Sequence, residues 1–171
     1  MLGHPGGEEH SRRMIALSGV TPPAKWLDMG AGDGSTMRLL QKLGFDAIGI
    51  DLAPRSEDVI QRNYLESPFE DESFDGIISQ CSYYVSGDVP TALQQAARML
   101  KKGGKLVFSD VTENADVLSE QLRQCGFRII HQEDLTPVWR EYYLEALWTQ
   151  ENVCLPQGKK FRYLLFVCER M

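Results

Sequence analysis

Glycines and acids alternate in one short stretch of the chain. Residues 25–34 read KWLDMGAGDG, so Asp28 closes an apolar run and Gly30, Gly32 and Gly34 follow it. Glycine turns with positive φ and lets a ligand lie against bare backbone. A helical pattern comes next, and a helix N-terminus offers free N–H groups to whatever binds there. A strand, a glycine loop and a helix in this order predict a cofactor-binding loop.

The spacing of the glycines indicates which kind of cofactor. Dinucleotide-binding loops read G-x-G-x-x-G and hold a pyrophosphate at the helix N-terminus. This loop reads G-x-G-x-G, and Ser35 stands where the third dinucleotide glycine would be. The carboxylate of Asp28 suits a ligand with a cationic end better than a pyrophosphate. A second acid, Asp51, ends the run AIGID near the position of a ribose-binding carboxylate. The structural alternative is a tight turn that binds nothing.

These two acids and the loop between them resemble the cofactor site of class I S-adenosylmethionine-dependent methyltransferases. The resemblance implies an α/β fold with a doubly wound, mostly parallel, seven-stranded type of sheet whose last strand is antiparallel. It implies S-adenosyl-L-methionine as the cofactor and no metal. By resemblance and position, the expected cofactor-binding residues are Asp28, Gly30, Ala31, Gly32, Gly34, Asp51, Leu52, Asn63, Tyr64 and Gln80.

The segment that reads RNYLESPFEDESFD resembles the family segment before its fourth strand. In that family an acid upstream of the Pro-Phe pair accepts a hydrogen bond from the adenine amino group. Asn63 has the matching position here, and its side-chain oxygen can accept the same bond. Tyr64 follows where a backbone N–H usually meets the ring. As alternatives, Asn63 is a turn residue and Tyr64 a packing aromatic.

Residues 80–84 follow the strand expected at 76–79, at the end where ligands bind in open α/β sheets. The resemblance places the methyl acceptor there. No catalytic residue is obligatory, because the cofactor's own sulfonium activates the methyl group. Candidates for a base are Tyr83, Tyr84 and Asp110. We expect one of the two tyrosines to belong to the core, and Asp110 to cap a helix or orient the acceptor.

Hydrophobic periodicity places the remaining elements. The ranges 8–17, 90–100 and 115–125 read as helices, and 105–110, 127–133 and 161–168 as strands. The pair Gly103-Gly104 is expected to end the second of these helices. The chain after Asp51 is short, so one or two helical turns at 56–60 and a rudimentary or missing third strand are expected. The sheet is therefore trimmed on this side.

At 171 residues the chain is long enough for a single methyltransferase-like domain, 1–171. Its N-terminal part, 1–24, is a loop and a helix that either covers the cofactor pocket or forms a surface turn, with His4 as an ordinary loop histidine. An aromatic-rich insertion occupies 135–157, before the last strand. Its aromatic residues Trp139, Tyr142 and Tyr143 belong either to the core or to a cover over an apolar or aromatic acceptor.

Bulk properties exclude several classes. A net charge of −6 and a pI near 5.1 argue against a nucleic-acid partner, which needs a concentrated basic face. No apolar run reaches the roughly 18 residues that a membrane span needs, and the N-terminus is unlike a secretory signal. The cysteines Cys81, Cys125, Cys154 and Cys168 are far apart, as expected of reduced thiols in the cytoplasm.

The predicted function is transfer of a methyl group from S-adenosylmethionine to a small-molecule acceptor by in-line displacement. Two alternatives stay open: a protein that binds S-adenosylmethionine without transfer activity, and an NAD(P)-dependent oxidoreductase. A metalloid methyltransferase needs two or three converging thiols, and only Cys81 is expected near the pocket. The acceptor and the oligomeric state do not follow from the sequence.

Overall fold

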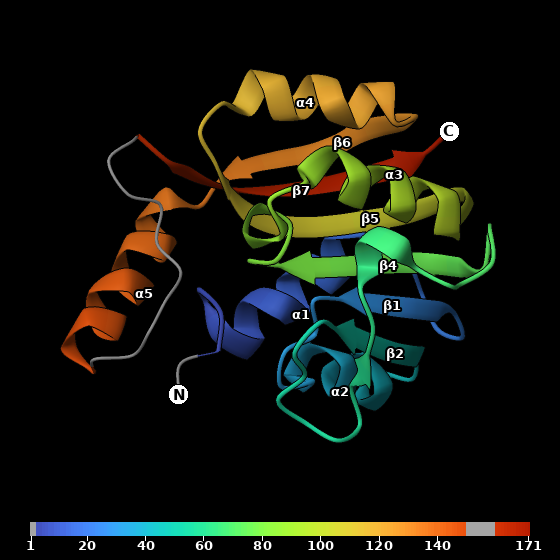
Figure 1. Cartoon of the computed structure of the whole chain (residues 1–171), viewed down its shortest axis with the longest axis horizontal. Coiled ribbons are helices and arrows are strands. Elements are labelled where there is room, and N and C mark those ends of the chain that lie inside the picture. The colour runs from blue at the N-terminus through green and yellow to red at the C-terminus, as the bar shows by residue number, and fades with distance from the viewer. Residues whose placement is uncertain (1–2, 150–159) are drawn as a thin grey trace.

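A central sheet organises the chain, and the computed structural model describes residues 3–149 and 160–171. Within these residues seven strands lie in the order β3-β2-β1-β4-β5-β7-β6 (Figure 1). The strands are β1 (Lys25–Met29), β2 (Asp46–Asp51), β3 (Ile60–Gln61), β4 (Phe74–Gln80), β5 (Leu100–Thr112), β6 (Phe127–Asp134) and β7 (Arg162–Arg170). β7 is antiparallel to both β5 and β6, whereas the other pairs are parallel. The expected fold class, with its antiparallel last strand, is confirmed.

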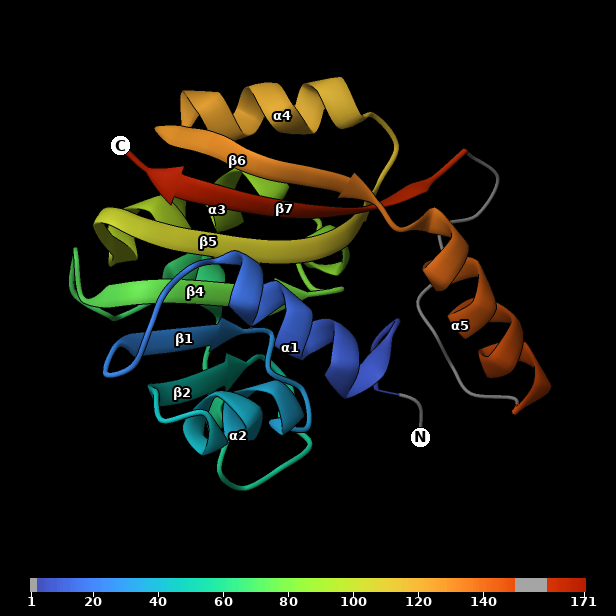
Figure 2. The ribbon, with the colours of Figure 1, turned by 180° about the vertical axis from the view of Figure 1, so that it is seen from behind.

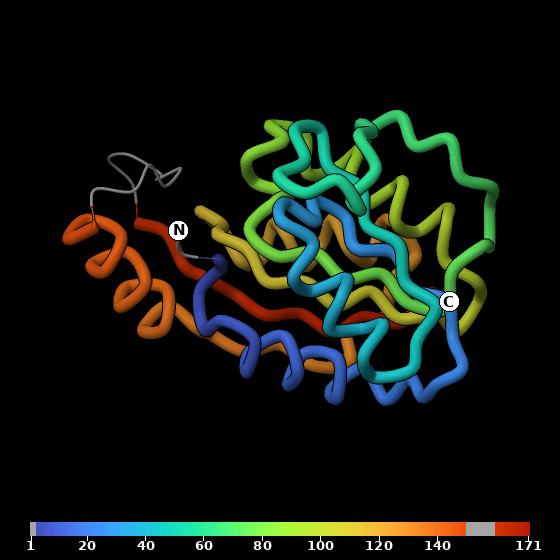
Figure 3. Tube along the Cα trace, turned by 90° about the horizontal axis from the view of Figure 1, so that it is seen from below, coloured from blue at the N-terminus to red at the C-terminus, as the bar shows by residue number. Residues whose placement is uncertain are grey.

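Helices cover both faces of this sheet. They are α1 (Gly7–Leu17), α2 (Ser35–Lys42), α3 (Val89–Met99), α4 (Ala115–Gln124) and α5 (Thr136–Trp148), with short 3-10 turns η1 (Tyr64–Glu66) and η2 (Tyr84–Ser86). Figure 2 shows α1 and α2 on one face, and α3 and α4 pack on the other. In Figures 1 and 3, α5 extends beyond the end of the sheet, close to the start of α1. No helix in the described parts of the chain is both long and apolar enough to cross a membrane.

Burial on both faces explains the apolar strands. In β7, Leu164 and Phe166 belong to the core under α3 and α4, while Tyr163 and Leu165 belong to the core under α1 and α2. Strands that are covered on both faces read as continuous apolar runs rather than as alternation. The sequence FRYLLFVC is such a run, so its two-sided packing follows directly from its composition.

The chain between β2 and β3 differs from its expected form. Residues 52–59 contain turns and no helix, so the expected helical turns at 56–60 are wrong. The backbone amide of Arg55 instead donates to the Gly32 carbonyl at 2.9 Å, and the backbone amide of Arg62 donates to the Asp51 carbonyl at 2.9 Å. Held at both ends, this segment is too short to coil into a helix and still return to the sheet. The rudimentary third strand is confirmed, since β3 has two residues.

The junction of α3 and β5 also corrects an expectation. The helix ends at Met99, and the strand begins at Leu100, before the Gly103-Gly104 pair that was expected to end the helix. Leu100 is fully buried and pairs with Phe74, after which the register shifts before Gly76. Packing of Leu100 against the sheet therefore outweighs the local glycine signal, and the glycines lie within an irregular part of the strand.

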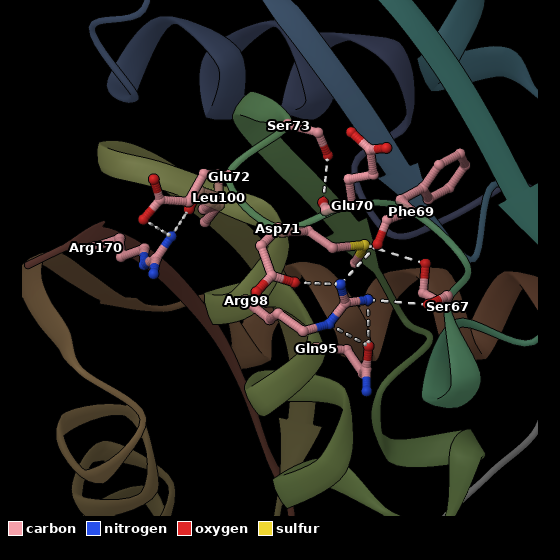
Figure 4. A network of polar contacts seen from close by, with 11 residues as sticks. Ser67, Phe69, Glu70, Asp71, Glu72, Ser73, Gln95, Arg98, Leu100 and Arg170 are labelled. Atoms are coloured by element: carbon pink, nitrogen blue, oxygen red, sulfur yellow. Dashed lines mark hydrogen bonds and ion pairs between the residues drawn. The ribbon is translucent and has the colours of Figure 1, made fainter.

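Arg98 connects α3 to the segment that leads into β4 (Figure 4). Its guanidinium donates to the carbonyl of Ser67 at 2.9 Å, to the carbonyl of Phe69 at 2.6 Å and to Asp71 at 2.7 Å. The segment has little regular structure of its own, so its carbonyl groups take their partners from this side chain. This contact holds the Pro-Phe segment in place beside η1.

Candidate functional site

The loop between β1 and α2 needs glycine for two separate reasons. Gly30 and Gly32 have φ of 82° and 55°, a region that other residues rarely adopt. A Cβ atom at Gly30 would also lie 2.0 Å from Oγ of Ser82, on the loop after β4. The amides of Gly30 and Ala31 donate to the Ile50 carbonyl, which ties the loop to β2. The loop is therefore packed too tightly for any side chain at Gly30.

Asp28 carries an unsatisfied polar atom at the edge of this loop. The residue is 3% exposed, and its Oδ2 atom has no hydrogen-bond partner. Burial raises the pKa of the Asp28 carboxyl to about 7, an effect that a hydrogen bond from the Met37 backbone partly opposes. Buried polar atoms normally have partners. A cationic group that donates to Oδ2 would satisfy the atom and favour the charged carboxylate.

Asp51 lies at the end of β2 with its side chain directed at the loop. Its Oδ2 atom accepts from the Gly32 amide at 2.9 Å, and its Oδ1 atom accepts from the Ala53 amide at 2.9 Å. Each carboxylate oxygen has a further lone pair for a hydroxyl donor. Next to it, Leu52 is 66% exposed. An apolar side chain beside a carboxylate suits a nucleoside, with its flat base and its ribose hydroxyls.

A large cavity lies at the carboxyl ends of β1, β2, β4 and β5. Its volume is about 1180 Å³, slightly above the range of about 300–1,000 Å³ that is usual for ligand pockets. The expected cofactor residues that line it are Asp28, Gly30, Ala31, Gly32, Asp51, Leu52, Asn63, Tyr64 and Gln80. Gly34 does not line the cavity; it precedes α2 as its N-cap, with φ 78°.

The side of the cavity that was expected to hold adenine differs in detail from the expectation. The side-chain oxygen of Asn63 accepts from the Leu65 amide at 3.0 Å and so caps η1. Tyr64 is buried, and its hydroxyl donates to the Ser82 carbonyl at 2.8 Å. Asn63 thus faces the cavity with one lone pair already in use. The segment from 63 to 65 presents its backbone and one amide side chain to the cavity.

The three candidates for a base have different surroundings. Tyr83 is buried in the core, where its hydroxyl contacts Met29 Sδ at 3.5 Å, and burial raises the pKa of this phenol well above its ordinary value. It does not line the large cavity, whereas Tyr84 and Asp110 do. The structure therefore removes Tyr83 from the candidates. As expected of two adjacent tyrosines, one belongs to the core.

Asp110 accepts hydrogen bonds from the loop after β4 and does not cap a helix. It accepts from the Tyr84 amide at 3.1 Å and from its neighbour Val111 at 2.8 Å. The cap of α4 is Asn114 instead, which accepts from the first amides of the helix. Burial raises the pKa of the Asp110 carboxyl to about 6, against the opposing effect of these backbone donors. The residue is 5% exposed, so it reaches the cavity with little of its surface.

Gln80 connects the end of β4 to the N-terminal segment. Its Oε1 atom accepts from Thr36 Oγ1 at 2.9 Å and from Ser11 Oγ at 3.2 Å, and its Nε2 atom lies 3.2 Å from His4 Nδ1. The other ring nitrogen of His4 is 3.1 Å from Ser11 Oγ. Burial lowers the pKa of His4, so the ring is neutral at pH 7. His4 was expected to be an ordinary loop histidine, and no local pattern placed it in the cavity.

Two aromatic residues of α5 complete the lining. Trp139 and Tyr142 line the cavity, and the Tyr142 hydroxyl donates to the Gly3 carbonyl at 3.1 Å. Trp139 stacks on Tyr143 with ring centroids 5.7 Å apart. At the far end of the helix, Trp148 is 86% exposed, so the described part of the 135–157 insertion is not simply a core stripe. Residues 150–157 of that insertion lie outside the described residues.

Comparison with known proteins now identifies the family. A family described as a methyltransferase domain matches residues 11–157, so the chain belongs to this family. The sarcosine/dimethylglycine N-methyltransferase of Halorhodospira halochloris is 30% identical over 81% of this chain and 56% of that protein. The chain spans about half the length of the first curated relatives it matches. The resemblance to class I S-adenosylmethionine-dependent methyltransferases is confirmed.

Solved structures share the fold. Haemonchus contortus phosphoethanolamine N-methyltransferase 2, in complex with S-adenosyl-L-methionine, superimposes with a TM-score of 0.80 at 19% identity, over 98% of this chain and 53% of that chain. The (4+2)-cyclase SpnF superimposes with a TM-score of 0.78 at 17% identity, over 95% of this chain and 80% of that chain. The same fold thus occurs in proteins that are named for different reactions, so the fold alone does not determine the reaction.

Proposed function

We propose that the chain binds S-adenosyl-L-methionine in this cavity and transfers its methyl group to a small molecule. The observation that carries the proposal is the buried, unpartnered Oδ2 atom of Asp28 at the edge of the glycine loop. S-Adenosylmethionine ends in an ammonium group, which is the donor that this atom lacks. When bound, the cofactor supplies a methyl group activated by its sulfonium.

The main task of the residues around the cavity is to bind and orient the reactants. Asp51 and the exposed Leu52 fit a ribose and a base, and the glycine loop allows close approach of the nucleoside. Holding a nucleophile near attack distance can supply about 7–11 kcal/mol of the barrier. Tyr84 and Asp110 remain the candidates to orient an acceptor or take its proton, because both line the cavity. The cavity volume leaves room for an acceptor beside the cofactor.

Two alternatives receive less support from the site. An NAD(P)-dependent oxidoreductase would bring a pyrophosphate to a loop that has Ser35 in place of the third glycine and the carboxylate of Asp28 beside it, which repels a phosphate. A metalloid methyltransferase needs thiolates, but burial raises the pKa of the Cys81 thiol to about 12. Within the described residues no cluster of metal-binding side chains occurs. A binding protein without transfer activity is tested directly by turnover.

Calorimetry of the full chain with S-adenosylhomocysteine and with S-adenosylmethionine tests the first step. We expect micromolar binding of both, and weaker binding by about ten-fold or more in Asp28→Asn. The control is Asp46→Asn, an exposed acid at the start of β2. Absence of binding at millimolar cofactor rejects the proposal. Binding without formation of S-adenosylhomocysteine across amine, phenol and thiol acceptors favours the binding protein instead.

A further inference from the structure

One half of the cavity is separate from the residues assigned to the cofactor. The loops after β1, β2 and β3, together with Gln80 at the end of β4, form the cofactor side, whereas the residues after Gln80, the end of β5 and the helix α5 form the other side. This second side, here called the acceptor half, is built by Tyr84, Val85, Asp110, Val111, Trp139 and Tyr142. Its composition indicates the class of molecule that it holds.

The acceptor half carries negative charge and no positive charge among the residues that the structure describes. Asp110 is its carboxylic acid. His4, which lines the cavity next to Gln80, adds no positive charge at pH 7, because burial lowers its pKa. Among the described lining residues, the one permanent cation of the whole cavity is Arg55. Its guanidinium lies over the cofactor loop, where a Cβ atom at Gly32 would be 2.8 Å from it. A carboxylate or phosphate in the acceptor half would therefore face Asp110 without a countercharge.

Aromatic rings from two elements line this space, and each of them packs against a second ring. Trp139 stacks on Tyr143 at 5.7 Å with an interplanar angle of 12°. Tyr84 meets Phe161 edge to face at 5.6 Å with an angle of 83°. Rings held in this way provide flat apolar contact surfaces at little entropic cost, and they attract other rings and cations.

We propose that the acceptor half binds an aromatic molecule that carries no negative charge, either neutral or cationic. The inference rests on the proposed function, because it assigns the acceptor class of the same site. Rings such as those of Trp139 and Tyr142 stack with an aromatic acceptor, and Asp110 disfavours an anionic one while tolerating an amine. The site thereby selects by shape and by the sign of charge.

Three probes that share one ring system test which ligand charge the acceptor half prefers. They are the neutral 2-naphthalenemethanol, the cationic 2-naphthylmethylamine and the anionic 2-naphthoate. Their affinities are measured by calorimetry on the full chain, with and without saturating S-adenosylhomocysteine. We expect the alcohol and the amine to bind at least ten-fold more tightly than the acid. A fourth probe, the fully saturated decalin analogue of the alcohol, is expected to bind several-fold more weakly than the aromatic alcohol. Equal or tighter binding of naphthoate, or equal binding of the saturated probe, overturns the proposal.

A positive charge added to the acceptor half gives a second test, because the expected result is tighter binding, which a misfolded variant could not produce. Val85 lines the acceptor half and is 53% exposed, so it accepts a polar side chain without repacking the core. Val85→Lys is expected to raise the affinity for naphthoate at least ten-fold, whereas the matched Val85→Gln is not. An unchanged affinity in the lysine variant contradicts the charge argument. Trp139→Leu is expected to weaken the ring probes several-fold and leave S-adenosylhomocysteine binding unchanged.

The inference about the acceptor half and the proposed function can be rejected independently of each other. If S-adenosylhomocysteine does not bind but the free chain still selects the neutral and cationic rings, the proposed function is rejected and the class of ligand stands. If the cofactor binds and is turned over but naphthoate is preferred, the inference about the acceptor half is rejected and the proposed function stands.

Discussion

The Oδ2 atom of Asp51 accepts a hydrogen bond from the backbone N–H of Gly32 at 2.9 Å. The carboxylate at the end of β2 therefore fixes the loop that follows β1, in addition to facing the cavity. One side chain thus shapes the loop and offers further acceptor sites to a ribose, so the two roles should be lost together.

Replacing this carboxylate is expected to weaken cofactor binding strongly. Asp51→Ala removes a charged acceptor from the Gly32 amide, an interaction worth about 1.5–3 kcal/mol, and removes the expected ribose contact. We predict a fall in S-adenosylhomocysteine affinity of about ten- to a hundred-fold, measured by calorimetry. Asp46→Ala, at the other end of β2, is the control and should bind normally. An unchanged dissociation constant for Asp51→Ala would contradict the assigned role.

Gly30 should tolerate no side chain. Gly30→Ala places a Cβ atom 2.0 Å from Ser82 Oγ on a residue with φ 82°. We expect cofactor binding to fall by more than a hundred-fold as the loop moves. Gly126→Ala is the matched control, because its φ is 84° but nothing lies within 4 Å of the new atom. It should cost about 1–2 kcal/mol of stability and leave the cofactor affinity intact. Similar affinities in both variants would show that the contact with Ser82 does not matter.

The buried carboxyl of Asp28 makes stability depend on pH. Its pKa is about 7 in the folded chain against an ordinary value of 3.8, so the folded state holds this proton more tightly than the unfolded state. The free protein should therefore lose stability as the pH rises from about 4 through 7, by up to about 4 kcal/mol from this group. Asp110 acts in the same direction, with a pKa of about 6.

Urea denaturation of the wild type and of Asp28→Asn at pH 5 and pH 8 measures this effect. The variant should gain stability relative to the wild type at pH 8, where the wild type buries a charge, and less at pH 5. Cofactor affinity should change in the opposite sense, rising with pH through about 7 in the wild type. A constant difference between the two proteins across this pH range would exclude the titration of Asp28.

Arg98 should contribute to stability rather than to binding. Arg98→Ala leaves the carbonyls of Ser67 and Phe69 without their donor, and we expect a loss of about 2–3 kcal/mol in the free energy of unfolding. Arg123→Ala, which removes an exposed ion pair with Glu120 at 3.6 Å, is the control and should cost less than about 0.5 kcal/mol. Equal losses from both substitutions in chemical denaturation would show that the contacts of Arg98 in Figure 4 are not stabilising.

Sequence patterns predicted those parts of the fold that depend on neighbouring residues in the chain. The loop at Gly30 and Gly32 and a last strand covered on both faces, expected at 161–168 and found at 162–170, follow from spacing and apolar runs. The turns expected at 56–60 were wrong, because the Arg55 amide is held by Gly32. The start of β5 was expected at Lys105 but lies at Leu100, because Leu100 packs into the sheet. Contacts between distant segments decided these two places.

In the candidate site, too, some features follow from local sequence and others from contacts between distant segments. The acids Asp28 and Asp51 have a fixed relation to the strand ends, so their sequence positions predicted that they would line the cavity. His4 reaches it only because α1 lies across β4 and Gln80. No periodicity in the first ten residues could reveal that contact. Which of Tyr83 and Tyr84 enters the core likewise depends on the path of the loop that Asp110 holds.

The position of β7 between β5 and β6 has a consequence for folding during synthesis. Until residues 162–170 leave the ribosome, β5 and β6 have no partner on their facing edges. The nascent chain therefore carries two open strand edges, which are the surfaces that invite mispairing. We therefore expect the sheet to close only after β7 has been made, and the folding yield of this protein to depend on what shields those edges until then.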